Sequence, residues 1–92
     1  MRTNILPEPL PWLGRGNVAA GQGDWTQAER AFRTALEIDR TSAAALNNRA
    51  EALRQLGCPE AAAQALRAGM PAIAADDALR PVLEQTRREI EA

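Results

Sequence analysis

Cys58, the single cysteine of this 92-residue chain, is the first side chain that could do chemistry. It precedes Pro59 and Glu60, a pattern typical of a helix amino end, where the helix dipole can activate a thiol. The chain contains no histidine that could act as the base for such a nucleophile. We therefore expect Cys58 to be a helix N-cap. A lone cysteine can form no internal disulfide that would indicate a cellular compartment.

Acidic side chains are the other candidates for catalysis or metal binding. Carboxylates act as general acids or metal ligands, usually together with residues such as histidine, lysine or tyrosine. This chain has none of those three residue types. Helix capping, interaction with helix dipoles and pairing with arginines account for the acidic residues Glu29, Glu37, Asp39, Asp76 and Asp77. We predict no catalytic residue, no metal ion and no cofactor.

The composition indicates what kind of domain holds these residues. Hydrophobic residues make up 46% of the chain but aromatic residues only 3%, and much of the apolar content is alanine, which favours closely packed helices. A chain of this length forms one domain at most. A net charge of −1 argues against a nucleic acid partner. The sequence has no run of about 18 apolar residues, so we do not expect it to insert into a membrane. The compartment stays open, with the cytoplasm as the default.

Residues 1–9 are predicted to be a proline-rich leader or linker. Pro7, Pro9 and Pro11 stand at alternate positions, which disfavours helix and favours an extended chain. Such a segment could dock on an aromatic-lined groove, but alternating proline also makes a semi-rigid spacer with no partner. We favour the linker.

Two helices joined by a glycine turn are expected next. Apolar and small residues recur at helical spacing over about 10–20, and Gly21 and Gly23 then stop the helix. Asp24 is the expected N-cap of a second helix that extends to Ile38, because Gln27 follows three residues later.

A second pair of helices is expected after residue 40. Thr41 or Ser42 can cap a helix that ends near Gly57. Cys58 would cap the next helix, because Pro59 suits the first helical position.

The last expected helix follows a break in the chain. Gly69 and Pro71 interrupt the fourth helix, and Asp76 or Asp77 can then cap a fifth. Pro81 is tolerated within the first turn of that helix. Its apolar stripe comprises Leu79, Leu83 and Ile90.

Residues about 34 positions apart resemble one another. Large residues align with large ones and small with small, and the order of helix, glycine turn and helix occurs twice. The aligned pairs include Trp12 with Leu46, Gly16 with Ala50, Gly23 with Gly57, Ala28 with Ala62, Phe32 with Leu66 and Arg33 with Arg67. This recurrence predicts a repeat protein.

These residues resemble the tetratricopeptide repeat, whose period is about 34 and whose order is aromatic, small, glycine turn, alanine, aromatic and alanine. The resemblance covers a first copy at about 9–42, a second at about 43–76 and a terminal capping helix at about 77–91, together forming a domain over 10–92. Arg40 stands where the family usually has proline, and Gly69 where it usually has alanine. The residues expected to pack the repeats are Trp12, Gly16, Ala28, Phe32, Ala35, Leu46, Ala50, Ala62 and Leu66.

The resemblance implies an all-α fold of about five helices, in which antiparallel hairpins form a fragment of a right-handed α-solenoid. Glu84, Arg87 and Arg88 would leave the outer face of the last helix polar, as a terminal helix needs.

The resemblance also implies a protein–protein interaction scaffold. In this family the first helix of each repeat lines a concave groove that binds a peptide or protein segment, and the second helices form the convex face. The groove residues would be Leu10, Leu13, Asn17, Asn47, Asn48, Glu51, Arg54 and Gln55. Some members grip a peptide's terminal carboxylate with two asparagines and several basic residues. Asn17 and Asn48 match the asparagines, whereas Leu13, Ala78 and Val82 stand at the basic positions.

Other functions remain open from the sequence. Two solvated asparagines on helices would need no ligand. Two repeats are also fewer than the roughly three that usually make a stable stack, so the chain could form a homodimer. It could instead be a structural or self-association module, or a regulatory appendage of a larger, possibly enzymatic, bacterial protein.

Overall fold

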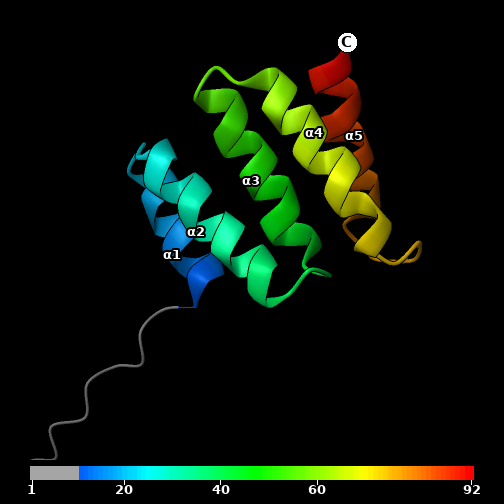
Figure 1. The fold of residues 1–92 in the computed structure, drawn as a ribbon, viewed down its shortest axis with the longest axis horizontal. Coiled ribbons are helices and arrows are strands. Elements are labelled where there is room, and N and C mark those ends of the chain that lie inside the picture. The colour runs from blue at the N-terminus through cyan, green and yellow to red at the C-terminus, as the bar shows by residue number, and fades with distance from the viewer. Residues whose placement is uncertain (1–10) are drawn as a thin grey trace, which may run out of the picture.

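The structure, a computed structural model, describes residues 11–92 and is all-helical over that range. Its elements are α1 (Trp12–Gly21), α2 (Trp25–Ile38), α3 (Ala43–Gln55), α4 (Pro59–Gly69), the short 3₁₀ helix η1 (Met70–Ala72) and α5 (Arg80–Glu91). Consecutive helices pack against each other, and α3 also contacts α1 and α5 (Figure 1). The all-α fold with five α-helices is confirmed.

The turn between α1 and α2 forms as the sequence predicts. Gly23 has a φ of 75°, a left-handed conformation that favours glycine. Asp24 then caps α2, because its carboxylate oxygen accepts a hydrogen bond from the backbone N–H of Gln27 at 3.2 Å. α1 begins at Trp12, and the Leu10 start that we expected lies outside the described residues.

Ser42 and Gly57 bound α3 for the same reasons. The Ser42 hydroxyl accepts a hydrogen bond from the Ala45 N–H at 3.2 Å, whereas Thr41 bonds to Asp39 instead. Gly57 has a φ of 79° in the turn that leads to α4. Cys58 is the N-cap residue of α4, but its side chain makes no capping bond; its Sγ lies 3.8 Å from the Leu56 carbonyl oxygen.

The start of α5 differs from the prediction. Asp76 and Asp77 are not its N-cap; Leu79 occupies that position, and the helix begins at Arg80. Asp77 accepts a hydrogen bond from the Leu79 N–H at 2.8 Å, so its carboxylate closes a turn before the helix. The Arg80 guanidinium donates to the carbonyl oxygens of Met70 and Ile73, at 3.1 and 2.8 Å, and ties this turn to η1.

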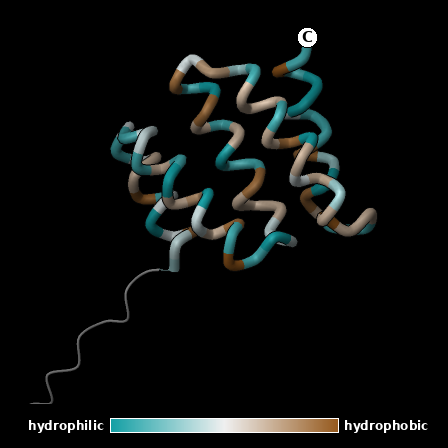
Figure 2. The backbone as a smooth tube through the Cα atoms, in the orientation of Figure 1, coloured by the Kyte–Doolittle hydropathy of each residue, from teal (hydrophilic) through white to brown (hydrophobic). Residues whose placement is uncertain are grey.

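The core runs between the helices as two clusters of buried side chains. Apolar residues are interspersed with polar ones along the helices (Figure 2), and α3, in the middle of the layer, has buried residues on more than one face. The smaller cluster joins α2 to α3 through Ala28, Phe32 and Ala52. The larger one includes Leu46, Leu66, Ile73 and Leu83, and so binds α3, α4 and α5 together. Leu79, expected on the inward stripe, is 38% exposed because it precedes α5.

In each repeat a glycine allows the two helices to approach closely, but the two glycines lie on different helices of their hairpins. A Cβ atom on Gly16 of α1 would lie 2.3 Å from the Phe32 ring of α2. A Cβ atom on Gly69 of α4 would lie 2.6 Å from Leu46 of α3. In the first repeat the first helix therefore has the small residue, and in the second repeat the second helix has it.

Most of the predicted packing residues are buried. Gly16, Ala28, Phe32, Leu46, Ala50, Ala62 and Leu66 are buried, and Ala35 is half-buried. Trp12 is 39% exposed, and its ring lies 4.6 Å from the Arg15 guanidinium. Within residues 11–92, no helix packs on the outer side of α1 to cover this ring.

Candidate functional site

Asn17 and Asn48, the two asparagines of the predicted groove, lie in contact. α1 and α3 are neighbours, and the Asn48 Nδ2 donates a hydrogen bond to the Asn17 Oδ1 at 3.1 Å. Asn17 is exposed and Asn48 is half-buried. The structure therefore brings together two amides that are far apart in the sequence, on the face shared by α1 and α3.

This pair retains unused hydrogen-bonding capacity. Each asparagine amide offers two donors and an acceptor oxygen. The contact between them uses one donor of Asn48 and one lone pair of Asn17. Both donors of Asn17 and the oxygen of Asn48 have no other partner among residues 11–92. A peptide unit has one N–H and one C=O, so the pair can in principle bind both.

The remaining polar residues predicted for the groove interact with α5 or with one another. The Thr86 hydroxyl donates to the Asn47 Oδ1 at 2.7 Å, and Arg54 lies 3.5 Å from Glu89. Arg54 also pairs with Glu51, which accepts a further bond from Gln55.

The hydrophobic residues of the predicted set are placed differently. Leu13 is half-buried and packs against the cluster of Ala28, Phe32 and Ala52. Leu10 lies outside the described residues. Ala78 and Val82 are exposed and supply no positive charge where a carboxylate-binding site would need one.

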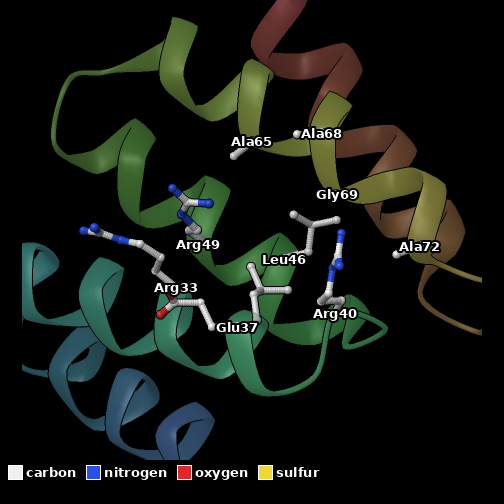
Figure 3. Close-up of a pocket in the computed structure, with 10 residues that line it drawn as sticks. Arg33, Glu37, Arg40, Leu46, Arg49, Ala65, Ala68, Gly69 and Ala72 are labelled. Atoms are coloured by element: carbon white, nitrogen blue, oxygen red, sulfur yellow. The ribbon is translucent and has the colours of Figure 1, made fainter.

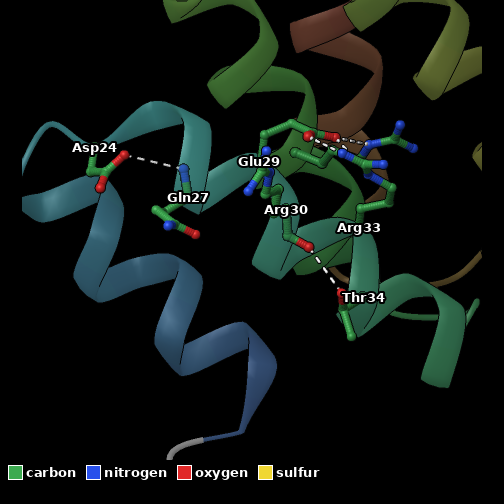
Figure 4. A network of polar contacts seen from close by, with 7 residues as sticks. Asp24, Gln27, Glu29, Arg30, Arg33 and Thr34 are labelled. Atoms are coloured by element: carbon green, nitrogen blue, oxygen red, sulfur yellow. Dashed lines mark hydrogen bonds and ion pairs between the residues drawn. The ribbon is translucent and has the colours of Figure 1, made fainter.

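Glu29 is a buried carboxylate that joins the two repeats. It accepts two hydrogen bonds from Arg33, at 2.6 and 3.2 Å (Figure 4). The Arg49 Nε of α3 donates a third at 3.1 Å. Burial acts to raise the pKa of Glu29, but the bonds and positive charges of the two arginines outweigh it and hold the pKa below the usual value of 4.5. Glu29, one of the acidic residues considered for catalysis or metal binding, thus has a structural role as the partner of two arginines.

Other side chains that could do chemistry have ordinary structural roles. Figure 4 shows the Asp24 cap, and the Asp39 carboxylate bonds to both the N–H and the hydroxyl of Thr41, which lowers its pKa. Cys58 is exposed. Among residues 11–92, no three or more histidine, cysteine or acidic residues are grouped to hold a metal ion. Nor is any helix in that range both long and apolar enough to cross a membrane.

A hollow of about 370 Å³ between α2 and α4 was not predicted from the sequence (Figure 3). Its basic lining residues are Arg33, Arg40 and Arg49. They come from α2, from the turn after α2 and from α3, so no local motif connects them. The one signal in the sequence was Arg40, which replaces the proline usual in the resembled family.

Two sequence profiles of the tetratricopeptide repeat match the chain, over residues 9–42 and over residues 31–64. No curated protein and no solved structure was found to match it. The two profile matches together span α1, α2, α3 and the start of α4, which pack as consecutive helices. The chain therefore belongs to the tetratricopeptide repeat family, whose repeats are in general non-catalytic protein–protein interaction modules.

Proposed function

We propose that this module binds an extended segment of a partner protein on the face shared by α1 and α3. The contact between Asn17 and Asn48 is the observation that supports the proposal. It holds two amides side by side on neighbouring helices, with donors and an acceptor still available to the peptide backbone of a ligand. Glu51 and Gln55 extend the proposed site along α3, and their mutual hydrogen bond fixes their side chains.

The proposed site recognises main-chain groups. Backbone N–H and C=O groups occur in every peptide, so the asparagine pair would contribute affinity and the residues around it would select the sequence. A neutral hydrogen bond contributes about 0.5–1.5 kcal/mol. Removing both amides should therefore weaken binding by roughly five- to a hundredfold.

Calorimetric titration of the double variant Asn17→Ala, Asn48→Ala tests this proposal. The ligands would be peptides enriched on the immobilised chain from a random library at high salt, where ionic contacts are screened and hydrogen bonds to the peptide backbone persist. The matched control is Gln27→Ala, Gln64→Ala, which removes two exposed amides from α2 and α4. We expect the asparagine variant to lose affinity and the glutamine variant to keep it, with circular dichroism showing equal helicity.

Two results would contradict the proposal. Equal affinities for the two double variants would show that ligands do not use the asparagine pair. A stable dimer, detected by light scattering, in which both asparagines are protected from solvent would favour the alternative of a self-association module.

A further inference from the structure

The hollow between α2 and α4 is lined by none of the residues of the peptide site proposed above. Arg33, Leu36 and Glu37 of α2 line one wall, and residues of α4 and η1 line the other. α3 forms the floor through Leu46 and Arg49. Its volume of about 370 Å³ falls within the range of about 300–1,000 Å³ typical of ligand pockets.

The arginines of this hollow have donors to spare. Arg49 uses its Nε to bind Glu29, and within residues 11–92 its two terminal nitrogens have no acceptor. Arg40 makes no side-chain hydrogen bond or ion pair in the same range. A guanidinium group has five N–H donors. The hollow therefore presents several charged donors for which the described part of the chain supplies no acceptor.

These charges lie at two ends of an apolar surface. In Figure 3, Arg33 and Arg49 lie on one side of Leu46 and Arg40 lies on the other. The far wall consists of Ala65, Ala68, Gly69 and Ala72, which have little or no side chain. Gly69 must stay small because Leu46 occupies the space of its missing Cβ. The hollow thus has arginines at both ends and apolar residues, Leu36 and the alanines of α4 and η1, between them.

From this arrangement we infer that the hollow is a second binding site, which accepts an acidic segment of a protein. Aspartate or glutamate side chains would accept hydrogen bonds from Arg40 and Arg49, and a small aliphatic side chain between them would lie against the half-buried Leu36 and the exposed Ala68. Glu29 and Glu37 offset only part of the charge of the three arginines. No aromatic residue lines the hollow, so it lacks the stacking surface that single-stranded nucleic acid uses.

Peptide selection with charge-reversal variants tests this inference. A random dodecapeptide library would be selected on the immobilised full chain, and the affinity of enriched peptides measured by fluorescence anisotropy. We expect enrichment of acidic residues beside small aliphatic ones, and affinities that fall as salt is raised. Arg40→Glu should weaken these peptides by about tenfold or more, because attraction becomes repulsion. Ala68→Leu should weaken them by filling the hollow without a change of charge.

The matched control is Arg30→Glu. Arg30 is also exposed, lies on α2 and has no side-chain partner among the described residues, but it does not line this hollow. The Arg30→Glu variant should bind the enriched acidic peptides with unchanged affinity, and so should the Asn17→Ala, Asn48→Ala variant. Equal losses for Arg30→Glu and Arg40→Glu, or selected peptides without acidic residues, would overturn the inference. Peptides sensitive only to the asparagine pair would overturn it too, while supporting the function proposed above.

Discussion

Glu29 of α2 and Arg49 of α3 form the ion pair that connects the first repeat to the second, with the Glu29 Oε2 lying 3.1 Å from the Arg49 Nε. The Glu29 side chain is 10% exposed, so its charge depends on its two arginine partners and little on water. The connection between the repeats should therefore respond to pH.

Glu29→Gln should lower the free energy of unfolding at neutral pH by about 1–3 kcal/mol, because charge-assisted hydrogen bonds are lost. The folded pKa of Glu29 lies below its unfolded value, near 4.5. As pH falls, the unfolded chain takes up the proton first, so this stabilisation is complete above pH 4.5 and disappears as pH falls through the folded pKa. Urea unfolding of both proteins between pH 7 and pH 3 should show the difference shrinking. A difference constant across that range would contradict the assigned role of the charge.

Gly16→Ala should destabilise the first repeat by about 1–3 kcal/mol, because the new methyl group would overlap the Phe32 ring. Gly21→Ala is the matched control in the same helix, since a Cβ atom there meets nothing within 4 Å. The control should be neutral or stabilising by about 0.5 kcal/mol. Thermal unfolding followed by circular dichroism compares the two variants. Equal midpoints would show that the contact between α1 and α2 can widen to accept the methyl group without loss of stability.

Ala28→Leu should cost about 1–3 kcal/mol, because Ala28 is fully buried in the cluster with Phe32. Leu36→Met, at a half-buried position beside the larger cluster, should cost less, because it conserves volume. Chemical denaturation measures both. A larger loss for Leu36→Met would mean that the helix crossing at Ala28 has room to expand.

Leu83→Ala should cost about 2–5 kcal/mol, because this side chain is fully buried against α3 and α4. Deleting residues 76–92 should have a stronger effect and should also increase binding of a hydrophobic dye, since Leu66 and Ile73 belong to the same cluster. A truncated chain with unchanged solubility and midpoint would show that α5 is not needed as a cap.

Local signals in the sequence were enough for most helix boundaries. Asp24 and Ser42 cap the helices that follow them, and Gly23 and Gly57 lie in the turns expected there, each with a left-handed backbone conformation. The start of α5 could not be read in this way, because an aspartate can either cap a helix or close a turn before one. Arg80 contributes to the outcome through two carbonyl groups of a segment that precedes Asp77.

The binding surfaces were less predictable because they depend on contacts between helices. The sequence suggested that Asn17 and Asn48 face one groove, but not that they bond to each other. Asn47 bonds to Thr86, whereas the positions about 34 residues earlier are Leu13 and Ala52, which share an apolar cluster. At this position the contact between α1 and α3 is therefore apolar, whereas the equivalent contact between α3 and α5 is a hydrogen bond.

The opposite placement of glycine in the two hairpins also limits how the chain can misfold. If α3 replaced α1 as the hairpin partner of α2, Ala50 would take the place of Gly16 against the Phe32 ring, where an added Cβ atom would lie 2.3 Å from the ring. If α1 paired with α4, Gly16 would face the smaller Leu66 and leave a void. Repeats of similar sequence are prone to pairing with the wrong neighbour during folding. Here each first helix fits its own second helix best, so the fit of side chains within each hairpin favours the correct partner before the repeats stack.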